Sequence, residues 1–587
     1  MKTIACFFAL FLGFFLCASP AGADGLPSSV ELTRLMGNGT NLGNTMEACN
    51  NGAQYGHTTD DPAYYETLWG QPVTTREMIH GLKEAGFDTL RIPVAWMTNA
   101  TDLARQGDYT ISPAYLDRVE EIVSWAVDEG MYVLINDHWD GGWYGMFGSE
   151  SAETRALAME AYAGMWTQIA RRFEPYDEHV IFEGANEEIG ARFDENSPLY
   201  CSDSIDTYLT DNQRYALANQ VNQAFVDAVR ATGGFNASRF LLIPGYGTNI
   251  AQTCDSRFVM PRDIAEDRLL ISVHCYSPWS YCGASSAASA TPWGLAKDYD
   301  ALEKEIRMMS KFTAQGIGVV IGEYGVLPGS DGVLKEGTAV YHSYFLDLCD
   351  AYDCCPVLWD TSCFYDRRKL QFVDSGLADL YSLRRAALEG DYAEVREAAL
   401  ASIAAAAASA PTTFRTDAPE AAEGESVAWI MWSSGDWAIS YSVGDQYNPD
   451  SMTPGLVPVD AVISGEGTYT VSLDFTGTDK GYSNGVAFAA IGIANGEILR
   501  PGWAIHIQEL KLNGEPFSLK GRPYTTSDDG TCTRTNLFNE WVTALPDDAR
   551  VLYGPNISIS PTVLDRSDAA FSQLERIEVT FVYGPKK

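Results

Sequence analysis

Residues 37–400 alternate between short apolar runs and longer helix-like stretches. Apolar runs of this length are typical of buried strands in a parallel sheet. Start and stop signals support the helices: Thr74-Thr75 stands at the start of one stretch and Gly86 follows it, and Ser112-Pro113 begins the next, which Gly130 ends. The predicted strands are 39–44, 89–94, 132–138, 180–187, 240–247, 269–276, 318–325 and 356–363, and the predicted helices include 75–85, 113–129, 155–173, 213–231 and 301–315.

Eight strand–helix units over this length predict an α/β fold, the (β/α)8 or TIM barrel, with enlarged loops. A doubly wound sheet is the alternative. Eight such units close into a barrel more naturally than they stay open.

The pattern changes after residue 400. The alanine run 404–408 and the Pro411-containing stretch after it are typical of a last helix that runs into a linker. Beyond residue 426, short alternating segments separated by Gly, Asn, Asp and Pro predict an all-β sandwich module. These segments are 437–443, 467–475, 485–493, 504–512 and 574–583. We therefore expect a targeting segment at 1–23, a barrel domain at 24–405, a linker at 406–425 and a β-sandwich module at 426–587.

The first 23 residues have the pattern of a secretory signal peptide. Lys2 is followed by the apolar stretch 4–17 and by the small-residue cleavage site Ala21-Gly-Ala23. The apolar stretch is short for a membrane anchor. We expect cleavage near Ala23 and a secreted, extracellular protein without a membrane partner; lipid attachment at Cys17 is the alternative, which Phe15-Leu16 disfavours.

The chain is acidic, with 40 Lys and Arg against 78 Asp and Glu and a net charge of −38 at pH 7. So negative a surface argues against nucleic acid, anionic membranes and polyanionic substrates such as pectin. A neutral polymer remains compatible. We expect a monomer.

Ten of the 12 cysteines remain once Cys6 and Cys17 leave with the targeting segment. An even number in an exported chain predicts disulfides that staple loops, with the pairing left open. The paired Cys-x-x-Cys spacing of a zinc site is missing. We expect no metal and no cofactor.

Chemistry-bearing residues stand at the carboxyl ends of the predicted strands, where barrels of this kind place their active sites. They are Arg91, His138, Asn186-Glu187, His274, Tyr276, Glu323 and Trp359. Two carboxylates that face one cavity are the minimal machinery for cleaving a glycosidic bond. A metal-dependent barrel hydrolase requires histidine ligands on an early strand, and the first predicted strand has none.

This set of residues resembles the family 5 glycoside hydrolases, the large group of retaining endo-β-glucanases. The resemblance covers residues 37–400 and includes the motifs Asn41-Leu-Gly-Asn44-Thr, Trp69-Gly-x-Pro72, Gly86-Phe-x-Thr-x-Arg91-Ile-Pro93 and Gly322-Glu323-Tyr-Gly325. The Trp69-Gly-x-Pro72 and Asn41-Leu-Gly-Asn44 motifs look most like those of the bacterial cellulase and xyloglucanase subgroup.

The resemblance implies that Glu187 is the acid/base and Glu323 the nucleophile. It implies substrate-site positions for Arg91, His138, Asn186, His274, Tyr276 and Trp359. The chain departs from the family at Glu188, where proline is common, and at His138-Trp139, where many members have two histidines.

Electrostatics predicts unequal roles for the two carboxylates. Arg91 and the Tyr276 hydroxyl are expected to stabilise a charged Glu323, whose charge then raises the pKa of Glu187 and keeps it protonated. The neighbouring Glu188 is a further group able to shift that pKa. Asn186 is expected to bond the sugar 2-hydroxyl, and Trp359 to offer its flat face to the sugar.

Further aromatic residues are candidates for contact with sugar rings, although about half are expected to pack in the core. In the barrel we favour Trp143 and Trp279 from the set Trp96, Trp139, Trp143, Tyr144, Trp279, Tyr281 and Trp293, with Asn44 as a polar contact. In the β-module, Trp429, Trp432, Trp437, Tyr447, Trp503, Tyr524 and Trp541 suggest a carbohydrate-binding module, or else the core of a sandwich.

The sequence thus predicts a secreted retaining endo-β-1,4-glucanase that hydrolyses cellulose-like, xyloglucan or mixed-linkage plant cell-wall β-glucans. The alternative enzyme is an endo-β-1,4-mannanase with the same catalytic pair. The alternative from another class is a non-catalytic glucan-binding protein, which the presence of both Glu187 and Glu323 disfavours.

Overall fold

The computed structural model describes residues 25–49, 58–101, 109–193, 209–285, 290–330, 332–444, 446–527, 530–539, 541–542, 545–552 and 563–586. The predicted targeting segment lies outside these residues. Within them, no helix combines the length and the apolar composition that crossing a membrane requires.

The chain divides into two compact units. One comprises residues 1–275, 305–324 and 348–397 and holds all eight barrel strands. The other comprises residues 276–304, 325–347 and 398–587 and holds the all-β module. The predicted domain bounds of 405 and 426 stay a prediction; the last helix of this region, α14, continues to Ser409, and the first strand of the module begins at Ser426.

Eight parallel strands close into a barrel in chain order, which confirms the predicted fold. The last strand pairs with the first through Gly39 and Val357. The strands are β1 (Gly39–Asn41), β2 (Thr89–Ile92), β3 (Tyr132–Ile135), β4 (Val180–Glu183), β5 (Leu241–Asn249), β6 (Leu269–Cys275), β7 (Gly318–Tyr324) and β8 (Cys354–Leu358).

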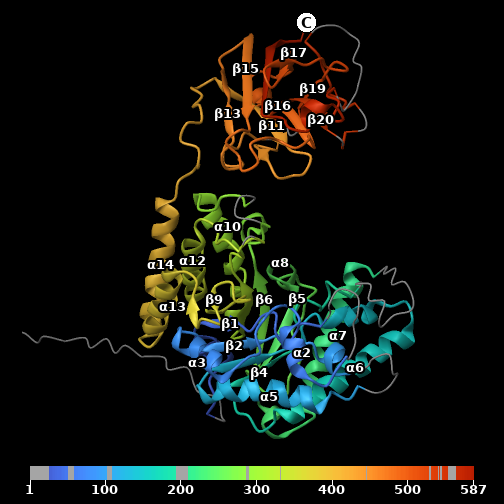
Figure 1. Ribbon diagram of the computed structural model, residues 1–587, viewed down its shortest axis with the longest axis vertical. Coiled ribbons are helices and arrows are strands. Elements are labelled where there is room, and N and C mark those ends of the chain that lie inside the picture. The colour runs from blue at the N-terminus through green and yellow to red at the C-terminus, as the bar shows by residue number, and fades with distance from the viewer. Residues whose placement is uncertain are drawn as a thin grey trace, which may run out of the picture. The chain divides into compact units, whose positions relative to one another are not determined.

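Helices lie outside the strands, as Figure 1 shows for α3, α5, α6 and α7. Side-chain caps begin several of them: Thr75 caps α3, and Thr210 with Gln213 forms a capping box on α7. The helices are α1 (Ser29–Leu35), α2 (Pro62–Thr67), α3 (Arg76–Glu84), α4 (Trp96–Ala100), α5 (Pro113–Asp128), η1 (Asp140–Gly148), α6 (Ala152–Arg172), α7 (Asp211–Arg230), η2 (Gly234–Ala237), α8 (Ile250–Thr253), α9 (Trp279–Cys282), α10 (Ala296–Arg307), α11 (Ser310–Thr313), α12 (Thr338–Ala351), α13 (Ser375–Leu388) and α14 (Tyr392–Ser409), and a small hairpin pairs β9 (Tyr365–Asp366) with β10 (Gln371–Phe372).

The first helix closes one end of the barrel. Leu32 and Met36 belong to one apolar cluster with inward residues of the strands, among them Leu134, Leu270 and Val320. Burying these side chains together stabilises the barrel by the hydrophobic effect. The opposite end, where the strands finish, is left to polar side chains.

The all-β module consists of two antiparallel sheets with a shared apolar core. Trp429, Trp432 and Tyr524 are buried in the module, so three of the seven aromatic candidates there are packing residues. One sheet has the order β12 (Ser440–Tyr441), β11 (Ser426–Ser433), β16 (Phe488–Ile493), β20 (Thr533–Asn539), β19 (Thr525–Ser527), with β14 (Ala461–Ile463) also on β11; the other has the order β13 (Val457–Val459), β15 (Gly467–Asp474), β21 (Arg576–Pro585), β17 (Trp503–Leu512), β18 (Glu515–Pro516), and the short helices α15 (Gly496–Leu499) and η3 (Ala569–Phe571) complete the module.

No disulfide joins any two of the nine cysteines within the described residues, so the expected loop-stapling disulfides do not form among them. Seven of the nine are buried. Buried thiols behave as small apolar side chains. The even count was therefore a poor guide to pairing.

Candidate active site

The polar end of the barrel collects the residues that the sequence placed at strand ends. Arg91 lies on β2, His274 on β6 and Glu323 on β7. Asn186 and Glu187 follow β4, and Trp359 directly follows β8. The strand order brings these positions around one opening, because parallel barrel strands finish at the same face.

Arg91 hydrogen-bonds several polar residues of the site at once. Its guanidinium is fully buried and donates to Glu183 Oε2 at 2.7 Å, to Glu323 Oε1 at 3.0 Å and to Asn186 Oδ1 at 2.8 Å. It also donates to Asn41 Oδ1 at 2.9 Å. The planar guanidinium thereby fixes Glu323 and Asn186 at once. Since Asn186 uses its oxygen here, its amide hydrogens are the groups left for a sugar hydroxyl.

The two predicted catalytic carboxylates lie side by side. One oxygen of Glu187, one of Glu323 and a ring nitrogen of His274 all lie within 4.8 Å of one another. His274 Nδ1 is 3.0 Å from Glu187 Oε1 and 3.6 Å from Glu323 Oε2. The imidazole thus bridges the pair.

The charges in this pair differ from the expectation. Burial by itself raises the pKa of Glu187, but the hydrogen bond with His274 and the charges of His274, Arg192 and Arg91 outweigh it and lower the pKa to about 2. Burial lowers the pKa of His274, and the charges of Glu323 and Glu187 reverse that shift, so its pKa is raised overall. In the free site the shared proton therefore resides on His274, and Glu187 is ionised. The prediction that Glu187 is kept protonated was wrong.

His138 and Trp359 form the wall beside the carboxylates. Their rings stack at 5.5 Å with an angle of 11° between planes. Burial, with the charges of Arg91 and His274, holds the pKa of His138 well below its usual range. His138 is therefore neutral and acts through hydrogen bonding and packing.

A cavity of about 200 Å³ opens above the carboxylates. It brings Asn44, His138, Asn186, Glu187, Glu323 and Trp359 together, as the sequence predicts. It also includes Trp139, an aromatic candidate that was not among the two favoured ones, and three residues that were not predicted as site residues: Glu47, Trp69 and Arg192. Arg192 Nη2 lies 3.2 Å from Glu187 Oε2, and the Trp69 and Trp139 rings lie 6.3 Å apart.

The unusual Glu188 is turned away from the cavity. It is fully buried, and its Oε1 accepts a hydrogen bond of 2.8 Å from the Trp139 backbone N–H. Burial and the charge of Glu187 raise its pKa to about 7, against the lowering effects of Arg192 and backbone hydrogen bonds. Trp139 itself has φ of +51°, a backbone conformation that bulky residues rarely adopt. Glu188 thus secures the turn that carries Trp139 into the cavity wall.

Trp143 requires a correction. Its side chain is fully buried, packs on Tyr144 at 4.4 Å and donates to Asp137 Oδ2 at 3.2 Å. It is a packing residue under its loop, because that loop folds its own aromatic side chains inward. Trp279 is 65% exposed, and its role as a sugar contact stays a prediction. Tyr276 follows β6 with its ring edge-on to Trp279, and its predicted bond to Glu323 also stays a prediction.

Glu183 is the functional neighbour that the sequence analysis missed. It is buried on β4, between Arg91 Nε at 2.7 Å and Ser272 Oγ at 2.6 Å. A glutamate within an otherwise apolar strand was the available signal. A buried carboxylate requires a charged or hydrogen-bonding partner. Here that partner is Arg91 on β2.

A family model described as cellulase (glycosyl hydrolase family 5) matches residues 51–364. The chain belongs to glycoside hydrolase family 5. The predicted family, enzyme class and barrel are thereby confirmed. Family 5 membership makes the chain a glycoside hydrolase of the cellulase type.

Individual family 5 proteins resemble the chain over the barrel. An endoglucanase A of Paenibacillus barcinonensis is 34% identical over 379 residues, covering 60% of this chain and 87% of that protein. A xyloglucan-specific endo-β-1,4-glucanase of Bacteroides ovatus is 33% identical over 363 residues, covering 58% and 67%. The structure of a family 5 lichenase mutant from Caldicellulosiruptor sp. F32 with cellotetraose is 29% identical with a TM-score of 0.52, covering 61% of this chain and 95% of that one.

Proposed function

We propose that this family 5 protein is a secreted endo-β-1,4-glucanase that cleaves internal bonds of β-glucans with retention of configuration. The observation that carries the mechanism is the spacing of Glu187 and Glu323, whose nearest site atoms lie within 4.8 Å. Retaining enzymes hold their carboxyl groups about 5–5.5 Å apart, and inverting enzymes about 6.5–9.5 Å apart to admit a water.

Glu323 is the proposed nucleophile because Arg91 fixes it. The bond from Arg91 Nη1 at 3.0 Å keeps one Glu323 oxygen charged and oriented. The other oxygen attacks the anomeric carbon as the bond to the leaving oxygen breaks, which forms a glycosyl–enzyme ester. Water then attacks that carbon and releases Glu323 as a carboxylate.

Glu187 is the proposed acid/base, supplied with its proton by His274. In the free site that proton resides on the imidazolium, whose Nδ1 is 3.0 Å from Glu187 Oε1. Transfer along this hydrogen bond protonates Glu187, which passes the proton to the leaving oxygen. His274 is left neutral, and Glu187 accepts a proton from the attacking water in the second step.

The proposed substrates are cellulose-like, xyloglucan and mixed-linkage β-glucans, in keeping with the names of the endoglucanase, xyloglucanase and lichenase relatives. Trp69, Trp139 and Trp359 give the cavity flat aromatic faces for neutral sugar rings. The net charge of −38 disfavours anionic polysaccharides. An endo-β-1,4-mannanase with the same pair is the second candidate, and a monomeric secreted protein cleaved near Ala23 stays part of the proposal.

Product analysis on cellulose, xyloglucan, mixed-linkage glucan and mannan tests the substrate. We expect internal cleavage of the β-glucans, seen as a rapid drop in viscosity, and a product whose anomeric NMR signal first appears in the β form. Initial α product contradicts retention. Faster cleavage of mannan contradicts the glucanase assignment, and absence of new reducing ends on all four contradicts an enzyme. Glu323→Gln is the inactive control.

A further inference from the structure

Two tryptophans of the all-β module are exposed and adjacent. Trp437 is 59% exposed and Trp541 is 58% exposed, and their ring centroids lie 5.7 Å apart with 44° between planes. A single exposed apolar side chain is common on a protein surface, but adjacent ones form a patch, and exposed apolar patches mark binding sites. Two other tryptophans of the module, Trp429 and Trp432, are fully buried in its core.

The sheet brings this pair together by register. Ser433 of β11, Phe488 of β16 and Asn539 of β20 are paired across three neighbouring strands. Trp437 follows the end of β11 and Trp541 follows the end of β20. The buried Phe488 lies beneath, with its ring 6.4 Å from Trp541. The two rings therefore lie at one end of one sheet, next to a buried apolar side chain.

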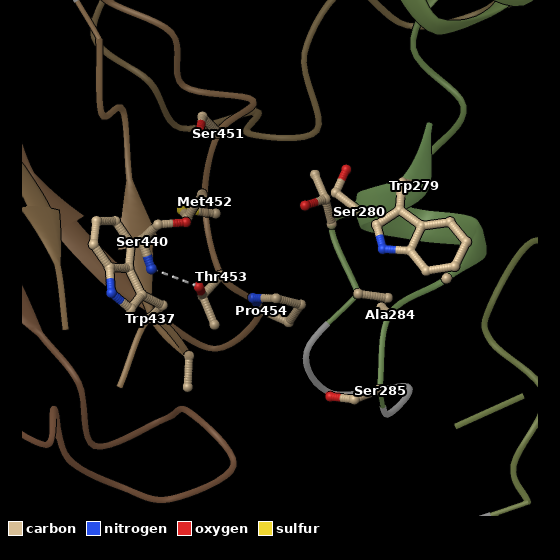
Figure 2. A pocket seen from close by; sticks show the side chains of 14 residues that line it. Trp279, Ser280, Ala284, Ser285, Trp437, Ser440, Ser451, Met452, Thr453 and Pro454 are labelled. Atoms are coloured by element: carbon tan, nitrogen blue, oxygen red, sulfur yellow. Dashed lines mark hydrogen bonds between the residues drawn. The ribbon is translucent and has the colours of Figure 1, made fainter. Parts of the chain in front are cut away.

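The backbone at Trp437 is held in an unfavourable conformation. Its φ is +59°, in the left-handed region that favours glycine. The turn that imposes it is well bonded: Asp436 accepts from Ser434 Oγ at 2.7 Å, Ala438 N–H at 3.2 Å and Lys480 Nζ at 2.6 Å. Beyond the turn, the Ser440 N–H donates to Thr453 Oγ1 at 2.9 Å, as Figure 2 shows next to Trp437. A strained turn that presents an exposed tryptophan points to a functional requirement for that ring.

The chemistry around the pair fits a sugar chain better than a protein. Two fully exposed tryptophan side chains would offer about 300–500 Å² and these two, each partly covered, offer less, whereas a stable protein interface takes about 800 Å² from each partner. Asp436, which precedes Trp437 in the chain, and Lys480, which donates to Asp436 at 2.6 Å, are side chains that bond hydroxyl groups. Aromatic faces flanked by such groups match the apolar face and the hydroxyl edge of a pyranose ring.

We propose that Trp437 and Trp541 form a β-glucan-binding site on the all-β module, separate from the catalytic cavity. The choice of β-glucan rests on the proposed function. Binding there raises the local concentration of polymer for the barrel, because the two share one chain.

The test uses the full chain carrying Glu323→Gln, so that polymer is bound and not cleaved. Retention is measured by affinity electrophoresis in gels with xyloglucan or mixed-linkage glucan and by sedimentation with insoluble cellulose. We expect Trp437→Gly and Trp541→Ala each to weaken retention at least fivefold on one or more of these polymers. Ile498→Ala, which removes a 60% exposed apolar side chain elsewhere on the module, should retain the parent affinity.

Trp437→Gly also separates binding from folding. Glycine adopts the positive φ without strain, so this variant should melt no lower than the parent while it binds less. Parent-like retention of both tryptophan variants overturns the site, as does a parent that none of the β-glucans retains. A parent dimer that Trp437→Gly dissociates also overturns it, in favour of a protein contact. Failure of the proposed function is seen separately, as lack of new reducing ends from the protein without Glu323→Gln.

Discussion

Nδ1 of His274 lies 3.0 Å from Oε1 of Glu187. This hydrogen bond joins a histidine whose pKa is raised to a glutamate whose pKa is lowered to about 2. The proton that the leaving oxygen takes up in the first step is therefore held one hydrogen bond away from the acid that delivers it. The pH dependence of the enzyme should then follow the pair rather than Glu187 alone.

Replacing His274 should move the alkaline limb of the pH–activity profile to lower pH. In the parent, the pair keeps its proton until the pH passes the raised pKa of His274. In His274→Asn, the proton resides on Glu187 alone and is lost nearer its own pKa. We expect kcat to fall about 10²-fold or more. The measurement is kcat/KM across the acidic and neutral range; an unchanged alkaline limb contradicts the assignment, and the exposed His80→Asn serves as the matched control.

The same pair sets a window of stability. The lowered pKa of Glu187 contributes stability that is present above its ordinary value of 4.5 and is lost as the pH falls towards about 2. The raised pKa of His274 contributes stability that is present below its ordinary value of 6.5 and is lost as the pH rises through the raised pKa. The difference in melting temperature between parent and His274→Asn should therefore be largest between these two values. A difference that is flat with pH contradicts the linkage.

Glu188→Gln should stabilise the protein at alkaline pH. The pKa of Glu188 is raised from 4.5 to about 7, so ionising it in the folded state costs free energy as the pH rises through this range. The cost reaches about 3 kcal/mol above neutrality. Glutamine removes that cost and keeps an oxygen for the Trp139 N–H. Urea unfolding should give equal stabilities near the ordinary pKa of glutamate and a more stable variant at alkaline pH.

Glu188→Ala separates the two roles of this residue. It removes the acceptor of the 2.8 Å bond that holds the Trp139 turn, so KM should rise while kcat changes less. Trp139→Ala should raise KM in the same direction. Equal KM values for Glu188→Ala and Glu188→Gln contradict a positioning role, and Glu150→Gln on the surface is the control for lost charge.

Zinc should inhibit the enzyme by occupying the site. Atoms of Glu187, His274 and Glu323 lie within 4.8 Å of one another, and imidazole with carboxylates is a donor set that Zn²⁺ accepts. The ion needs His274 neutral, so inhibition should strengthen as the pH rises. We expect inhibition that is competitive with substrate and reversed by EDTA. Inhibition that is independent of pH, or that persists in His274→Asn, places the ion elsewhere.

Much of the barrel follows from sequence, because buried parallel strands are apolar along their whole length. The ends of the strands were less accurate. The predicted run 132–138 is a strand only to Ile135, since the chain then turns to reach Trp139 at φ of +51°. The residues near the active site leave the regular strand conformation at this point. The hydrophobic pattern of the sequence does not show where a strand ends in this way.

In the β-module, one strand was not predicted and one predicted segment is mostly not a strand. Strand β11 was not predicted because all eight of its residues are buried, so it lacks the alternation of a half-exposed strand. The predicted segment 437–443 instead begins in a turn, and only Ser440–Tyr441 pairs as a strand. Tryptophan favours strands on average, and here the bonds of Asp436 override that preference.

Glu183 offers the sharpest test of how the site is supported. It is fully buried and bonds both Arg91 and Ser272, so Glu183→Ala leaves a buried guanidinium short of one partner. Breaking a buried pair from one side costs about 3–5 kcal/mol. We expect a lower melting temperature and a lower kcat, because Arg91 is then free to move from Glu323 and Asn186. Glu183→Gln keeps an acceptor for Arg91 and should lie between parent and alanine in both measurements; an alanine variant that melts and turns over like the parent contradicts this support of Arg91.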